Sequence, residues 1–100
     1  QHMRIDEQLE QFTTTQKVKL SAQENEIYRL RSAIVTDEAI VKMKSDMLVV
    51  IEDQFTNGII TQREYLEELE QVTMAKNTAA LHEVQLAQAI IQYQLLLGTL

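Results

Sequence analysis

Apolar residues recur at every seventh position through the first half of this chain. Six successive positions with this spacing are Leu20, Ile27, Ile34, Val41, Leu48 and Phe55. A seven-residue apolar repeat is typical of the contact stripe of a coiled coil. In the second half, alternating steps of four and three residues mark a second stripe at Tyr65, Leu69, Val72, Lys76, Ala79, Glu83, Leu86, Ile90, Tyr93 and Leu97. The pattern predicts two long helices that pack along these stripes.

The segment Asn57-Gly58-Ile59-Ile60-Thr61 is the only strong helix breaker in a sequence with two glycines and no proline. Gly58 can adopt a positive φ angle without steric cost, and Asn57 tolerates it better than most residues. Thr61 followed by Glu64 matches a capping box, and Ile60 with Tyr65 matches a hydrophobic staple. The first helix should therefore end at this segment and the second should begin after it.

These patterns predict an all-α fold, a long two-helix antiparallel coiled-coil hairpin. We expect the first helix over about residues 4–56, a turn at about 57–60 and the second helix over about 61–98. Folding back at the turn places Leu48 opposite Leu69 and Leu20 opposite Leu97. Residues 4–17 then have no counterpart in the second helix. Gln1 to Met3 resemble a cloning remnant, so the domain is taken as residues 4–100.

The chain has more apolar residues than one helix pair needs. Hydrophobic residues make up 45% of the sequence, and many lie off the two stripes. The surplus positions are Ile40, Met43, Met47, Val49 and Val50 in the first helix and Leu66, Ala80, Leu81, Ala87, Ile91 and Leu96 in the second. Such positions require further neighbours. We therefore expect the hairpin to be a piece of a larger helical assembly.

Charge and composition argue against several classes of function. The net charge is −6 and the basic residues are dispersed, which does not suit a nucleic-acid partner. Leu48 to Ile51 is the longest aliphatic run, far below the roughly 20 residues that cross a bilayer, so we expect no bilayer contact from this segment. His82 has no second ligand at metal-binding spacing and is expected to be a packing or surface residue. We expect no enzymatic activity, metal or cofactor.

Residues 55–100 carry an ordered set of features that resembles one known family. An aromatic residue precedes a turn glycine, a hydrophobic residue and threonine follow, a leucine-rich helix has alanine and lysine in its middle, and Gly-Thr-Leu closes the segment. These features fall on Phe55, Gly58, Ile60-Thr61, Leu66, Ala75-Lys76 and Gly98-Thr99-Leu100. The set resembles the outer-membrane efflux protein family, the TolC-like channel-tunnels of tripartite multidrug efflux and type I secretion.

The resemblance implies the second periplasmic helical hairpin of a homotrimeric outer-membrane channel, so that the chain would be a fragment of a larger α-helical barrel. The turn would be the periplasmic tip, which docks the membrane-fusion adaptor protein and reaches the inner-membrane pump only indirectly. The expected docking residues are Phe55, Thr56, Asn57, Gly58, Ile59, Ile60 and Thr61. A gap-free match to the family's best-known member also places Glu64 and Glu67 where acidic side chains line the channel entrance, and the capping role of Glu64 favours Glu67.

The chain departs from that member at two positions that help to lock the entrance. Phe55 and Ile60 stand where a tyrosine and an arginine form polar links, so closure of the entrance would use another group such as Arg63 or would be less tight.

Two other functions remain open. One is a hairpin of the adaptor itself, although the arginine, leucine and serine pattern of adaptor tips is missing. The other is a structural coiled coil without a role in transport.

Overall fold

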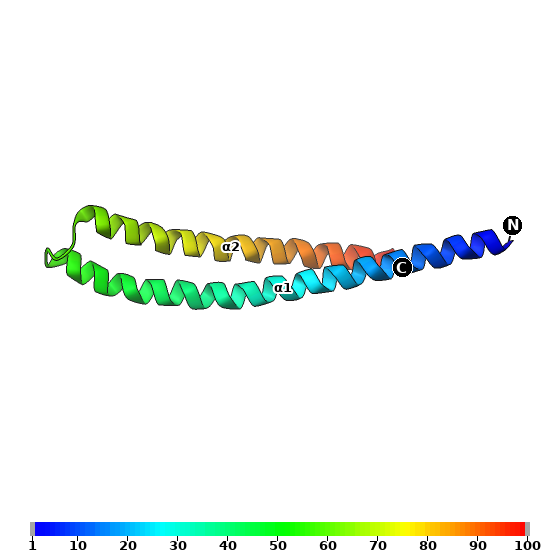
Figure 1. Ribbon diagram of the computed structural model, residues 1–100, viewed down its shortest axis with the longest axis horizontal. Coiled ribbons are helices and arrows are strands. Elements are labelled where there is room, and N and C mark those ends of the chain that lie inside the picture. The colour runs from blue at the N-terminus through cyan, green and yellow to red at the C-terminus, as the bar shows by residue number, and fades with distance from the viewer. Residues whose placement is uncertain (1, 100) are drawn as a thin grey trace. The chain divides into compact units, whose positions relative to one another are not determined.

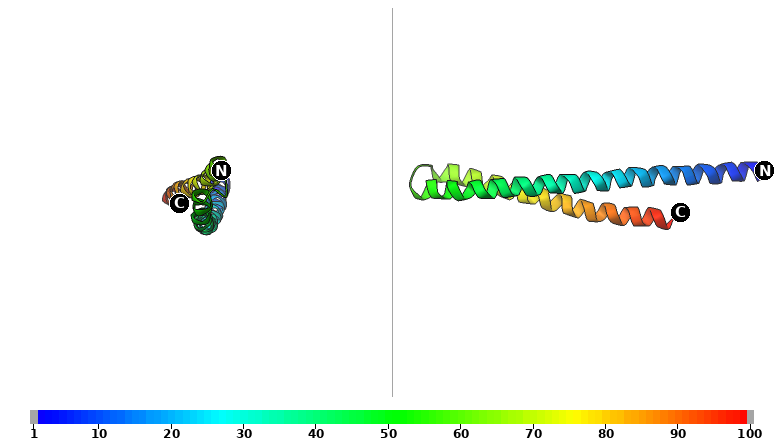
Figure 2. Two further views of the ribbon diagram at one scale, coloured as in Figure 1. Left: turned by 90° about the vertical axis from the view of Figure 1, so that its left-hand side faces the viewer. Right: turned by 90° about the horizontal axis from the view of Figure 1, so that it is seen from below.

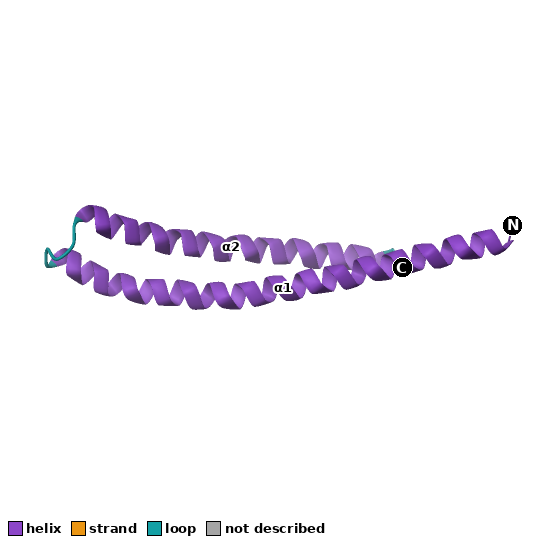
Figure 3. Cartoon of the chain, in the orientation of Figure 1, coloured by secondary structure: helices purple, strands orange, loops and turns teal. Residues whose placement is uncertain are grey.

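The computed structural model consists of two helices joined by one turn. Helix α1 covers His2–Thr56 and helix α2 covers Gln62–Gly98 (Figures 1 and 3). The structure describes the backbone of residues 2–99 and the side chains of residues 4–99, and this part of the chain contains no strand. Gln1 of the expected cloning remnant and Leu100 of the closing Gly-Thr-Leu lie outside the described residues. The predicted all-α helical hairpin is confirmed.

The chain forms two compact units, each made from part of both helices. We call Ser32–Val84 the turn unit, and Gln1–Arg31 with Gln85–Leu100 the end unit. Within each unit, α1 and α2 lie side by side and run in opposite directions (Figures 1 and 2). Neither helix offers, over its described residues, an apolar stretch long enough to cross a bilayer.

Hydrogen bonds between the helices fix their register. In the turn unit, the Tyr65 hydroxyl donates to Glu52 over 3.3 Å. In the end unit, the Tyr93 hydroxyl donates to Glu24 over 2.9 Å. Each pair lies four residues along both helices from a predicted pair, Leu48 with Leu69 or Leu20 with Leu97. The alignment that the apolar stripes predicted is therefore the one that the structure adopts.

The buried stripe of α1 follows the predicted seven-residue repeat and adds a second position to each repeat. Leu20 is buried, and Ile27, Ile34, Val41 and Leu48 are half-buried. Leu30, which the seven-residue row does not include, is 1% exposed and is the most deeply buried large side chain among the described residues. Coiled coils bury two positions per seven residues, which explains the additional row.

The predicted stripe of α2 is wrong at four of its ten positions. Leu69 and Leu97 are 36% and 48% exposed, and Lys76 and Glu83 are also exposed. The less exposed residues at these levels lie one position earlier in the sequence: Glu68, Ala75, His82 and Leu96. A row that steps by four residues and then three lies on nearly the same side of a helix as a row that steps by three and then four. Hydropathy must then choose between the two rows, and it favours the apolar Leu69 over Glu68. The adopted order instead brings the small Ala75 and the pairing side chain of His82 against α1.

Polar residues interrupt the apolar seam in both units. In the turn unit, Asp37 is buried and pairs with His82, and Lys44 Nζ donates to Gln71 Oε1 over 3.0 Å. In the end unit, Gln16 is buried, and its Oε1 atom has no hydrogen-bond partner among the described residues. His82 is therefore part of the seam and is paired. Polar groups at seam positions specify register at a cost in stability.

The first part of α1 is exposed throughout. Residues 4–15 are all exposed, including the large apolar side chains of Ile5, Leu9 and Phe12, and Gln16 is the first buried residue. This observation agrees with the prediction that the start of the first helix has no counterpart in the second.

Candidate functional site at the hairpin turn

The end of α1 is built around the positive φ angle of Gly58. Its φ is 71°, and no other described residue has a positive φ, so Asn57 does not share this conformation. The Ile59 amide donates to the Gln54 carbonyl over 2.8 Å and the Gly58 amide donates to the Phe55 carbonyl over 3.1 Å. This pair of bonds is a Schellman motif, which satisfies the last carbonyl groups of a helix. The sequence Asn57-Gly58 therefore stops α1 through backbone geometry alone.

The start of α2 is capped by Thr61. Its hydroxyl accepts a hydrogen bond from the Glu64 amide at 3.1 Å, and its carbonyl accepts one from the Tyr65 amide at 3.1 Å. The return bond of a capping box, from the Thr61 amide to the Glu64 carboxylate, is absent among the described residues. Thr61 is thus an N-cap without the reciprocal bond of a capping box, and the Glu64 carboxylate takes no part in capping.

An aromatic pair connects the two helices next to the turn. The rings of Phe55 and Tyr65 stack with centroids 4.9 Å apart and an interplanar angle of 15°. Partial burial, together with the charge of Glu52 and the hydrogen bond to it, raises the pKa of Tyr65 above its ordinary value. The stacking partner is an expected tip residue, but the sequence did not reveal the role of Glu52. A carboxylate directly opposite a tyrosine in the predicted register is the signal that could have found it.

The expected docking residues form an exposed surface. Phe55 through Ile59 and Thr61 are exposed, and only Ile60 is half-buried. Ile59 presents a large apolar side chain to solvent directly after Gly58. A Cβ atom built on Gly58 meets no atom within 4 Å. The backbone at Gly58 is therefore open to close approach, since no described residue covers it.

The two acidic residues expected at a channel entrance differ in their contacts. Both Glu64 and Glu67 are exposed. Arg63 Nε donates to Glu67 Oε1 over 3.3 Å, an exposed ion pair within one helix. The Glu64 carboxylate makes no hydrogen bond or ion pair with the described residues. The preference for Glu67 rested on a capping role for the Glu64 carboxylate, and the structure does not show that role.

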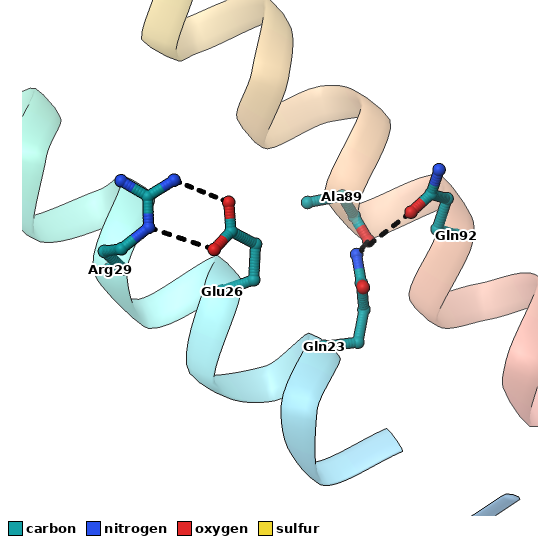
Figure 4. Close-up of polar contacts among 5 residues, drawn as sticks. All are labelled: Gln23, Glu26, Arg29, Ala89 and Gln92. Atoms are coloured by element: carbon teal, nitrogen blue, oxygen red, sulfur yellow. Dashed lines mark hydrogen bonds and ion pairs between the residues drawn. The ribbon is translucent and has the colours of Figure 1, made fainter. Parts of the chain in front are cut away.

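A second polar surface lies in the end unit. Figure 4 shows the Gln23 side chain of α1 reaching α2, where its amide nitrogen donates to the Ala89 carbonyl over 2.9 Å. On the same helix, Arg29 binds Glu26 through two hydrogen bonds, and this partner lowers the pKa of Glu26. These residues border a groove that also contains Gln85, Gln88 and Gln92. Among these amides, the half-buried Gln23 donates the hydrogen bonds that link the two helices in this unit.

The described residues show no arrangement suited to binding a metal ion. No three side chains of His, Cys, Asp or Glu gather closely enough to hold one. The Asp37–His82 pair has no third ligand of this kind. The turn, with its helix end, helix cap and exposed apolar residue, therefore remains the candidate site.

Comparison with models of known protein families, with curated protein sequences and with solved structures finds no match.

Proposed function

We propose that this chain is the second periplasmic tunnel hairpin of a trimeric TolC-like outer-membrane channel that serves tripartite efflux or type I secretion. In this proposal the turn from Phe55 to Thr61 docks a membrane-fusion adaptor, and the acidic residues just beyond it line the entrance. The inner-membrane pump is engaged through the adaptor. The hairpin itself acts as a structural and docking element and has no catalytic role.

The observation that carries the proposal is the open turn at Gly58. Helix α1 ends there in a Schellman motif, the backbone has a positive φ, and no atom of a described residue lies within 4 Å of where a Cβ atom would stand. A partner that approaches the backbone closely at a tip needs such an uncovered glycine. The resemblance of residues 55–100 to the channel family supports a membrane-fusion adaptor as that partner.

The exposed apolar residues give additional support. Isolated hairpins of a barrel should expose the side chains that contact neighbouring hairpins and protomers. Here Val49, Val50, Leu81 and Ile91 are all exposed, although each is a large apolar residue. The proposed tunnel gives these side chains the neighbours that a two-helix hairpin does not provide.

Site-specific crosslinking in the parent channel tests the proposal. A photoreactive amino acid at Ile59, which is exposed at the turn, is expected to capture the membrane-fusion adaptor in intact cells. The same group at Tyr28, an exposed position on α1 in the end unit, is the matched control and should give no adaptor product. Equal capture at both positions, or no capture at Ile59 in cells that assemble the pump, would refute the docking role of the turn.

A further inference from the structure

A groove between α1 and α2 runs along one side of the turn unit. Two adjoining hollows form it, with volumes of about 420 Å³ and 190 Å³. Lys44 and Gln71 line both hollows, and their mutual hydrogen bond spans the groove between them. The apolar lining consists of Ile40, Met74 and Ala75 in the larger hollow and Met47, Leu48, Ile51 and Val72 in the smaller one. The groove can therefore accept apolar side chains on both sides of the central Lys44–Gln71 hydrogen bond.

Two of the four methionines of the chain line this groove. Three of the four methionines of the chain, Met43, Met47 and Met74, belong to the turn unit, and all three are exposed. Met47 and Met74 line the hollows from opposite helices, and Met43 lies one helical turn from Met47. Methionine side chains are unbranched and polarizable, so they adapt to the shape of a partner and recur at helix-binding surfaces. These exposed side chains suit a binding groove.

The net negative charge of the chain lies in the turn unit. The turn unit contains ten acidic and four basic residues, which gives −6, whereas the end unit contains five of each and is neutral. Glu68 lines the smaller hollow, and Asp37, which is paired with His82, lines the larger one. Lys44 is the one basic residue among those that line the two hollows, and it is bonded to Gln71. A second copy of the chain would bring the same negative charge against this surface, and like charges in a contact are repulsive. Charge complementarity instead favours a basic partner.

We propose that this groove binds an amphipathic α-helix whose apolar stripe is flanked by lysine and arginine. The partner helix lies along the groove and forms a three-helix bundle with α1 and α2. Its apolar side chains contact Met47 and Met74, and its basic side chains face Glu68 and the acidic turn unit. This is the helix-in-groove mode of recognition, in which anchors spaced at helical intervals enter an apolar channel. The inference concerns a surface away from the turn and does not depend on the proposed transport role.

A fluorescent 18-residue peptide of leucine and lysine at helical spacing serves as the probe for the full 100-residue chain. We expect binding by fluorescence anisotropy at low salt, weakened as salt rises because the rim contacts are electrostatic. A peptide of the same composition in scrambled order keeps the charge but loses the apolar stripe, and it should bind at least about tenfold more weakly. A peptide with glutamate in place of lysine should not bind.

Serine variants locate the binding surface. The Met47→Ser/Met74→Ser variant removes apolar groups from the groove without changing charge, and we expect about tenfold weaker binding. Val49→Ser, which changes an exposed residue that lines neither hollow, is the matched control and should bind like the parent chain. Circular dichroism verifies that both variants remain helical. Methyl signals of Met47 and Met74 in nuclear magnetic resonance report contact in the unmodified chain, so the test does not depend on the variants alone.

Several results would overturn the proposal. Equal binding of the scrambled peptide would reduce the interaction to net charge. Unchanged methionine methyl signals at saturating peptide would place the peptide elsewhere. Sedimentation that shows the chain paired with itself, with these methyl signals sensitive to protein concentration, would assign the groove to a second copy.

Discussion

His82 Nδ1 lies 2.5 Å from Asp37 Oδ2, and the pair joins α1 to α2 within the seam of the turn unit. Only 11% of the Asp37 side chain and 24% of the His82 side chain are exposed. Sliding α2 by seven residues would put Ala75 or Ala89 in the place of His82 and leave the Asp37 carboxylate without its partner. The pair therefore acts against the alternative registers that a repetitive apolar stripe permits.

Removing one member of this pair should destabilise the hairpin. For His82→Ala we expect a loss of about 2–4 kcal/mol in the free energy of unfolding, because the Asp37 carboxylate loses its partner while it stays largely buried. Urea denaturation followed by circular dichroism measures the change. Glu83→Ala alters the exposed neighbouring residue and is the control, with little expected effect. The double variant Asp37→Leu/His82→Leu should regain most of the stability, and a double variant weaker than His82→Ala would contradict this interpretation.

Leucine-to-alanine substitutions distinguish the observed seam from the apolar row that hydropathy favours. Leu30→Ala should cost about 3–4 kcal/mol because Leu30 is 1% exposed. Leu69→Ala should cost about 1 kcal/mol because its side chain already contacts solvent. The measurement is again urea denaturation, with Leu97→Ala as a second half-exposed control in the end unit. Equal losses for Leu30→Ala and Leu69→Ala would mean that the seam of α2 has been misassigned.

The sequence was sufficient for the fold but not for the packing of each side chain. Period and turn chemistry determined the two helices, the positive φ of Gly58, the Thr61 cap and the pairing of the helices. The choice between Leu69 and Glu68 was wrong because one helix pair has no closed core, and small shifts in helix rotation exchange flanking residues with seam residues. Long-range polar pairs such as Tyr65 with Glu52 were also missed. Their geometry depends on both helices, whereas hydropathy describes one helix at a time.

Substitutions at Gly58 should depend on the backbone conformation that the new residue accepts. Gly58→Ala should lower the free energy of unfolding by about 1 kcal/mol, since the φ of 71° is strained for a residue with a side chain. Gly58→Asn should cost less because asparagine tolerates this conformation. No steric contribution is expected, because a Cβ atom there meets open space. Gly98→Ala, in which the glycine is helical, is the control and should not destabilise the chain.

The partial burial of Tyr65, together with its contact with Glu52, should make stability depend on alkaline pH. The folded state raises the pKa of Tyr65 above its usual value of 10.0, so the neutral phenol is favoured by folding. The corresponding stabilisation is fully present below about pH 10 and is lost as the pH rises through the folded pKa. Glu52→Gln removes the negative charge and should lower that pKa. Tyrosinate absorbance in a Tyr28→Phe/Tyr93→Phe background measures the titration of Tyr65 alone, and an unchanged midpoint would rule out Glu52 as a cause.

In the proposed trimeric channel, the acidic residues beyond the turn should control cation access. Three copies of Glu64 and Glu67 would form two carboxylate rings one helical turn apart, and such rings concentrate negative potential in a narrow opening. Since Glu64 has no described partner and Glu67 binds Arg63, we expect Glu64→Gln to reduce block by divalent cations more than Glu67→Gln does. Planar-bilayer conductance of the parent channel measures the block. Arg63→Gln removes the ion-pair partner of Glu67 and should strengthen the block by divalent cations. Glu70→Gln is the control on the same helix. Unchanged block in both Glu64→Gln and Glu67→Gln would remove these residues from the entrance.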